Sequence, residues 1–153
     1  MPRPSEQLAS LGLTLPPVPA PVAAYLPSVR SGSLVFTAGQ LPFVDGVLET
    51  TGKVGKDVTA DEGQRLAATA ALNAIAVVAE AAGGVDNVVR IVKVTVYVAS
   101  DPDFITHSAV ANGASDRIVE IFGEAGKHAR TSIGVAVLPM NSPVEVEIVA
   151  EVS

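Results

Sequence analysis

A long capped helix, followed closely by an alternating strand, limits the fold of this chain more than any other sequence feature. Thr59 and Glu62 form a capping box that predicts the start of a helix, and Gly83-Gly84 predict its end. Apolar residues cover this helix broadly, as in a helix packed on a sheet. Between Val92 and Val98, valines alternate with polar residues, which indicates a strand with one buried face.

The flanking segments supply further elements of both kinds. Ser5 is expected to cap a short helix that ends before Gly12, and the prolines that follow require an extended arm. Residues 25–30 and 34–38 are expected to form a hairpin around Ser31-Gly32-Ser33. We treat residues 1–153 as a single domain, with residues 1–24 as an N-terminal helix and proline-rich arm.

The remaining segments complete an α+β order of elements. Residues 39–57 are expected to form a loop, a second helix is expected over 104–122, and two strands close the chain. The predicted order is β-β-α-β-α-β-β, a mixed sheet with both helices on one face. The opposite face is then open and partly apolar, and a second copy of the chain is the expected cover.

The composition favours an oligomer and argues against two classes of partner. Apolar residues make up 48% of the chain, mostly Ala and Val, with no uninterrupted apolar run near the roughly 20 residues that span a bilayer. The net charge is −6 and the basic residues are scattered, so nucleic-acid binding is not expected. The chain has no cysteine, and its N-terminus lacks the apolar core of a secretion signal, so we expect a cytoplasmic protein.

The last quarter of the chain contains the most reactive pair of side chains. Arg130 begins one strand-like segment and Glu145 lies near the start of the next, with the short turn 140–143 between them. We expect the two strands to pair antiparallel, which would bring both side chains to one small region. Arginine grips a carboxylate bidentately, and a nearby glutamate can activate water.

Structural roles compete with chemical ones at several positions. An arginine near a glutamate is more often a salt bridge than a catalytic pair. Ser132 has no recognisable base beside it and is expected to offer a backbone contact. His107 and His128 are too isolated in sequence to predict a metal site, so no metal is expected.

Three spaced motifs together resemble the RidA/YjgF family. They are Phe36-Thr37-Ala38-Gly39-Gln40-Leu41-Pro42, the segment from Arg130-Thr131-Ser132 to Leu138-Pro139, and Val144-Glu145-Val146-Glu147. The resemblance implies a chorismate-mutase-like fold and a homotrimer with clefts between subunits. It implies hydrolysis of reactive enamines and imines, released by pyridoxal-phosphate enzymes, to 2-keto acids and ammonia without a cofactor.

The resemblance also implies roles for particular residues. Arg130 would hold the carboxylate of a small-molecule substrate, and Glu145 would orient or deprotonate the attacking water. The other positions would line the cleft: Tyr25 from a neighbouring subunit, Gly39, Asn112 and the backbone around Ser132.

Two departures from the family pattern leave alternatives open. Ala38 stands where typical deaminases have a serine, and Ser132 where many have a cysteine. These changes leave room for a noncatalytic binder of small carboxylates. An endoribonuclease or translation inhibitor, both older labels for the family, is disfavoured by the acidic net charge and the lack of a basic, aromatic-lined groove.

Overall fold

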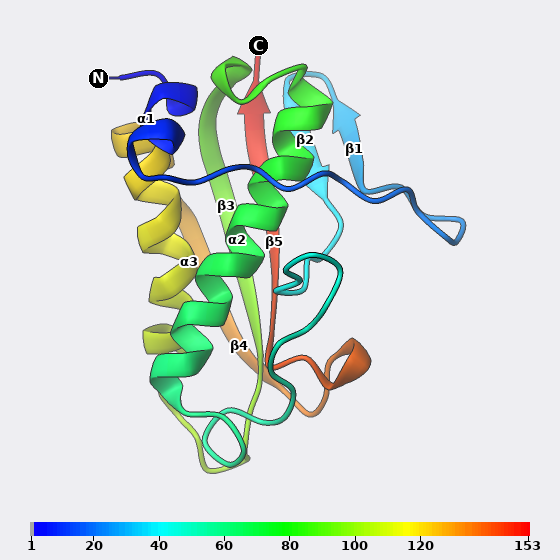
Figure 1. The fold of residues 1–153 in the computed structure, drawn as a ribbon, viewed down its shortest axis with the longest axis vertical. Coiled ribbons are helices and arrows are strands. Elements are labelled where there is room, and N and C mark those ends of the chain that lie inside the picture. The colour runs from blue at the N-terminus through cyan, green and yellow to red at the C-terminus, as the bar shows by residue number, and fades with distance from the viewer. Residues whose placement is uncertain (1) are drawn as a thin grey trace.

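A five-stranded mixed sheet forms one layer of the fold, and two long helices cover one of its faces (Figure 1). The computed structural model describes residues 2–153, so Met1 of the expected N-terminal arm lies outside it. In chain order the elements are α1 (Pro4–Ser10), β1 (Ser28–Ser31), β2 (Leu34–Thr37), α2 (Ala60–Ala82), β3 (Val88–Ala99), α3 (His107–Phe122), β4 (Ala129–Val135) and β5 (Val144–Val152). The predicted α+β class and order of elements are confirmed.

The strand order β1-β2-β5-β3-β4 corrects the expected pairing of the last two strands. β5 pairs antiparallel with both β2 and β3, whereas β4 pairs only with β3 and runs parallel to it. Burial explains this arrangement. β5 has a fully buried inward face, which a central strand provides, whereas β4 contains no buried residue and lies at the edge.

The core lies between the sheet and the two helices. β3 and β5 contribute their inward-facing residues, including Val94, Val96, Val146 and Ile148, all at most 1% exposed. Small residues on α2 (Ala67, Ala70, Ala71 and Ala74) let the helix pack closely on them. Among the described residues only α2 is long and apolar enough to span a membrane, but most of that window is buried, as in a core helix.

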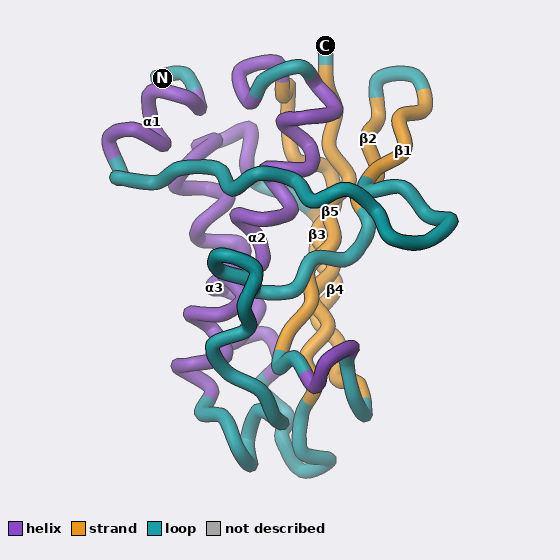
Figure 2. Tube along the Cα trace, turned by 45° about the vertical axis from the view of Figure 1, so that its right-hand side comes forward, coloured by secondary structure: helices purple, strands orange, loops and turns teal. Residues whose placement is uncertain are grey.

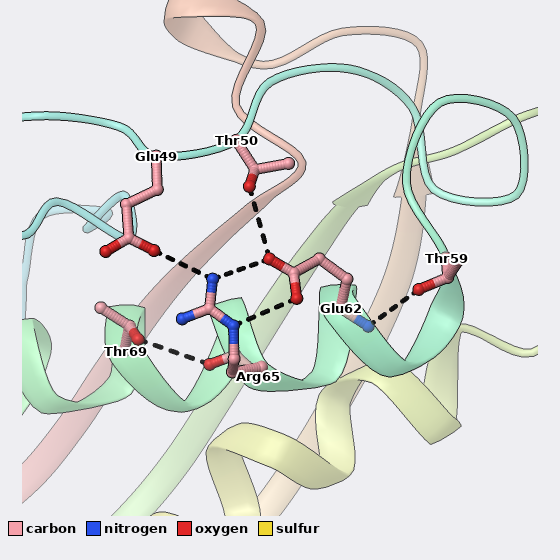
Figure 3. Close-up of polar contacts among 6 residues, drawn as sticks. All are labelled: Glu49, Thr50, Thr59, Glu62, Arg65 and Thr69. Atoms are coloured by element: carbon pink, nitrogen blue, oxygen red, sulfur yellow. Dashed lines mark hydrogen bonds and ion pairs between the residues drawn. The ribbon is translucent and has the colours of Figure 1, made fainter.

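A polar network fixes the start of α2 and the loop before it (Figure 3). The Thr59 side chain accepts a hydrogen bond from the Glu62 backbone N–H at 3.1 Å, which satisfies one of the free donors of the first turn. Arg65 donates to Glu62 at 2.7 Å and to Glu49 at 3.0 Å. The arginine lowers the pKa of the Glu62 carboxyl through this hydrogen bond. The network therefore ties the loop to the helix.

The sheet face opposite the helices is open and partly apolar, as predicted. Val29 and Phe36 pair directly across β1 and β2 and are 55% and 45% exposed. Ile133 on β4 adds a third apolar side chain to the same face and is 45% exposed. These side chains share the face with the polar groups Tyr97 and Glu145.

The segment before β1 crosses the helical layer and then leaves the domain. In both ribbon and tube views it runs from α1 across α2 and projects as a loop beyond β1 (Figure 2). Its start is anchored, because Ser5 donates two hydrogen bonds to Asp86, from its backbone N–H at 2.8 Å and its hydroxyl at 2.6 Å. Residues 21–26 of this segment, which include Val22 and Tyr25, are exposed.

Two threonine-to-alanine changes, one at the N-cap of α2 and one within the helix, should differ in their effect on stability. Thr59→Ala removes the cap and should lower the free energy of unfolding by about 1 kcal/mol. Thr69→Ala removes only a 3.4 Å hydrogen bond to the Arg65 carbonyl within the helix and should be neutral or slightly stabilising. Urea denaturation of both variants measures the difference. Equal losses would show that the cap does not contribute to stability.

Candidate functional site

Arg130 lies on β4 with its side chain on the helical side of the sheet. Its register partner on β3 is Val94, a core residue, which places both on the face covered by α3. The Arg130 Nη1 donates to the Asn112 Oδ1 at 2.8 Å and to the Ser115 Oγ at 3.1 Å, both on α3. The structure therefore brings together two predicted site residues, Arg130 and Asn112.

The charge of Arg130 is not neutralised by a carboxylate. Within residues 2–153 it makes no ion pair, whereas Arg3, Arg65 and Arg117 each pair with a glutamate. Both of its hydrogen-bond partners on α3 are neutral, so they orient the guanidinium and leave its positive charge available. Such an arginine is suited to hold an anionic ligand.

Glu145 lies on the other face of the sheet. Its neighbour in register is Tyr97, and the flanking residues Val144 and Val146 are fully buried on the helical side. A Cβ added to Gly39 would overlap the Glu145 carboxylate, so this glycine makes room for the carboxylate itself. The structure thus brings together two more predicted site residues, Glu145 and Gly39, which are in direct contact.

The Glu145 carboxyl is half-buried and has no hydrogen-bond donor within the part of the chain that the structure describes. Burial, and to a lesser extent the negative charge of Glu147, raise its pKa. Glu147 lies on the same face, as expected from the two-residue spacing, but it accepts a hydrogen bond from the Tyr97 hydroxyl at 2.8 Å. That bond, more than any other effect, raises the pKa of Tyr97 to about 12.

The predicted antiparallel pairing of β4 with β5 was wrong, and a single chain therefore does not bring Arg130 and Glu145 together. The two residues project to opposite faces, with β3 lying between their strands. Two strand spacings and three residues of offset put their Cα atoms roughly 14 Å apart. The short connection between the two strands suggested a hairpin, whereas β5 lies between β2 and β3.

The other predicted residues lie apart from this pair or beside one member of it. Ser132 is two residues from Arg130 on the same face of β4 and is partly exposed. Tyr25 is 59% exposed and lies in the projecting segment before β1, at the sheet edge opposite to β4. The predicted residues therefore form three groups on one chain: Arg130, Asn112 and Ser132; Glu145 and Gly39; and Tyr25 alone.

Two neighbours of Arg130 were not among the predicted site residues. Ser115 follows Asn112 by three residues on α3, and such spacing places side chains on one helix face. His128 precedes Arg130 by two residues, the spacing that puts strand residues on one face. It contacts Ser115, and burial lowers its pKa, with a smaller contribution from the Arg130 charge. Residue spacing could have identified both.

An apolar groove on the helical side lies apart from these clusters. This groove of about 620 Å³ lies between the proline-rich arm, the loop after β2 and α2, and none of the predicted site residues lines it. Within residues 2–153 no three histidine, aspartate or glutamate side chains are grouped as a metal site requires.

Comparison with known proteins defines the family. Residues 5–152 match the family described as "YjgF/chorismate_mutase-like, putative endoribonuclease". The chain is 42% identical to Protein TCP17 of Trypanosoma cruzi over 99% of its own length and 95% of that protein. It is 34% identical to the 2-iminobutanoate/2-iminopropanoate deaminase of Salmonella typhimurium, over 86% of this chain and 90% of the enzyme. The chain belongs to the YjgF/RidA family.

Solved structures show the same fold. The protein Atu1372 from Agrobacterium tumefaciens, of unknown function, superimposes with a TM-score of 0.90 at 40% identity, covering 98% of this chain and 92% of that one. Escherichia coli TdcF with bound serine superimposes with a TM-score of 0.65 at 27% identity, covering 89% and 94% of the two chains.

The unpartnered Glu145 carboxyl should reduce stability at neutral pH. Because its folded-state pKa is raised, the folded chain holds its proton more tightly than the unfolded chain, and stability falls as pH rises through the folded pKa. Glu145→Gln should therefore unfold at higher urea concentration than the parent at pH 7. The gain should vanish near pH 4, where the carboxyl is largely protonated in both states. An equal gain at both pH values would mean that ionisation of Glu145 is not the cause.

Proposed function

We propose that this protein hydrolyses reactive 2-imine and 2-enamine acids to 2-keto acids and ammonia, in clefts between the subunits of a homotrimer. The observation that carries the proposal is Arg130, a cation oriented by two neutral side chains and paired with no carboxylate. A deaminase of such acids is among the relatives, and TdcF holds serine, which carries a carboxylate. A carboxylate of the substrate would complete the hydrogen bonding of the guanidinium.

An enamine first tautomerises to its imine, with a proton leaving nitrogen and another joining the carbon chain, and the proposed reaction then adds water across the carbon–nitrogen double bond. Arg130 binds the substrate carboxylate, and Glu145 accepts a proton from the water that attacks the imine carbon. The resulting tetrahedral carbinolamine then loses ammonia as its hydroxyl becomes a carbonyl, so imine and water give keto acid and ammonia. The raised pKa of Glu145 brings its proton affinity closer to neutral pH, which suits a group that accepts and returns a proton.

The placement of the two residues supports a site shared between chains. Arg130 and Glu145 project to opposite faces of one sheet, so one substrate can touch both only when they belong to different copies. The open apolar face offers a surface on which copies can associate. The projecting segment with Tyr25 is free to reach a neighbouring subunit, which is the role proposed for that tyrosine.

A noncatalytic carboxylate binder is the second candidate. It needs only Arg130 and its partners on α3, and Ala38 supplies no hydroxyl beside Gly39 where typical deaminases have one. Release of ammonia and keto acid from freshly generated 2-aminoacrylate separates the two functions. The endoribonuclease activity in the family description is less favoured, because the net charge is −6.

Arg130→Lys should weaken binding of a keto acid such as 2-oxobutanoate roughly tenfold or more, although the charge is kept. Lysine offers a point charge in place of a planar fork with parallel donors. Arg117→Lys is the matched control, because Arg117 on α3 is neutralised by Glu120 at 3.3 Å. Isothermal titration of both variants measures the effect. Equal affinities in the parent and the Arg130 variant would assign Arg130 a purely structural role.

Mixing two inactive variants should restore activity if the site is shared. Arg130→Lys and Glu145→Gln should each slow hydrolysis strongly, the latter roughly 10²-fold as for loss of a general base. In trimers assembled from equal amounts of both chains, about a quarter of the clefts combine two native residues by random assortment. Denaturing and refolding the chains together should therefore recover about a quarter of the parental activity.

Two outcomes would contradict the shared site. Variants mixed after assembly, without exchange of chains, serve as the control and should stay inactive. No recovery after joint refolding would show that Arg130 and Glu145 do not act together in one shared cleft. Light scattering should give about 47 kDa for three chains of 15.6 kDa, and a monomer would exclude any site between subunits.

A further inference from the structure

The Arg130 guanidinium lies at one end of a continuous chain of hydrogen bonds. Its Nη1 donates to the Ser115 Oγ at 3.1 Å, the Ser115 Oγ lies 2.9 Å from the His128 Nε2, and the His128 Nδ1 lies 2.6 Å from the Gly126 carbonyl oxygen. The contacts join β4, α3 and the turn between them.

The donors and acceptors available on these groups allow only one direction for the row of hydrogen bonds. The Gly126 carbonyl can only accept, so the His128 Nδ1 carries the proton and donates it, which leaves Nε2 as an acceptor in the neutral ring. The single hydroxyl proton of Ser115 is therefore donated to Nε2. The lone pairs of Ser115 are then free to accept from Arg130. Every donor in the chain has an acceptor, and no proton is shared by two groups.

The last acceptor in this row of hydrogen bonds, the Gly126 carbonyl, belongs to backbone that is packed against α3. A Cβ added to Gly126 would lie 2.8 Å from the Ile118 carbonyl oxygen, so this segment packs directly against the backbone of α3. Ser115 lies on the same helix. The hydrogen bonds therefore fix the Arg130 guanidinium relative to α3 and not relative to a surface loop.

The surroundings of His128 favour the neutral ring that this direction requires. The ring is half-buried, and Arg130 faces it from β4. Arg90 and Lys127 line the hollow beside it, with Glu151 from β5 as the opposing charge. Lys127 is itself paired with Glu124 at 2.7 Å, and Asp116 follows Ser115 on α3.

We infer that Ser115 and His128 are positioning residues for Arg130, which fix one guanidinium nitrogen so that the others meet a ligand carboxylate in one geometry. Binding a ligand with an unrestrained arginine costs side-chain rotamer entropy, and ordering the arginine before binding removes part of that cost. The identity of the ligand rests on the proposed function, whereas the hydrogen-bond chain does not.

A double-mutant cycle tests whether Ser115 acts through Arg130. Ser115→Ala should weaken 2-oxobutanoate binding about tenfold, because a hydrogen bond to a charged group is lost. The same change in the Arg130→Lys background should cause little further loss. Ser115→Thr keeps a hydroxyl and should retain most of the affinity. The control is Ser108→Ala, on the exposed side of the same helix with no side-chain hydrogen bond among the described residues, and it should have no effect.

The histidine provides a readout that needs no ligand. Nitrogen-15 NMR of the free protein should show the neutral His128 ring with its proton on Nδ1. Addition of 2-oxobutanoate should raise the pKa of His128, because the bound carboxylate offsets the Arg130 charge that lowers it. His128→Gln should reduce keto-acid affinity in the parent but not in the Arg130→Lys background.

Each failure has a distinct meaning. A proton on Nε2, an unchanged affinity in Ser115→Ala, or an equal loss in both Arg130 backgrounds would overturn the positioning role. Keto-acid binding with no hydrolysis of 2-aminoacrylate would overturn the proposed deaminase and leave the positioning role intact. No keto-acid binding by the parent would overturn both.

Discussion

The candidate site depends on the position of β5 between β2 and β3. Because successive side chains on a strand point to opposite faces, burying Val144 and Val146 against the helices forces Glu145 onto the open face. The same strand exchanges two backbone hydrogen bonds with Gln40, at 2.8 and 2.9 Å. Those bonds hold Gly39 against the Glu145 carboxylate. The acid and the glycine beside it are thus placed by the demands of the core.

On the edge strand β4, the same alternation of side chains places Arg130 on the helical face, opposite to Glu145. β4 is parallel to β3, and the register that places Ile133 beside Tyr97 on the open face turns Arg130 toward α3. There the helix presents Asn112 and Ser115, one turn apart, as neutral acceptors. The cation and the acid therefore lie in different layers of one chain. A chemistry that needs both favours association of copies, which the exposed apolar residues of the open face also favour.

Local features of the sequence predicted most of the elements and the β1–β2 hairpin, but not the pairing of β4 and β5. Thr59 and Gly83 bound α2 as expected, because caps act through hydrogen bonds and backbone angles within a few residues. The pairing of β5 with β2 and β3 joins segments far apart in sequence, and no local pattern encodes it. The turn before β5 adds to the difficulty: Met140 and Asn141 both adopt left-handed backbone, and the chain crosses past β3 instead of folding back on β4. Burial distinguishes the last two strands, since β5 has a fully buried apolar inward face and β4 has no buried residue.

The two neighbouring glutamates of β5, Glu145 and Glu147, differ in hydrogen bonding. Glu145 and Glu147 share one face of β5, and Tyr97 lies within reach of that face. The Tyr97 hydroxyl donates to Glu147, whereas Glu145 is left half-buried with no donor in the described chain and a raised pKa. A sheet selected for stability alone would leave neither carboxylate in that state, since an unsatisfied buried acid opposes folding. Glu147 is held by the Tyr97 hydroxyl, which leaves Glu145 as the carboxylate that we propose takes a proton from water. Arg130 on the other face also has no carboxylate partner in the described chain, and the proposed function uses both of these groups.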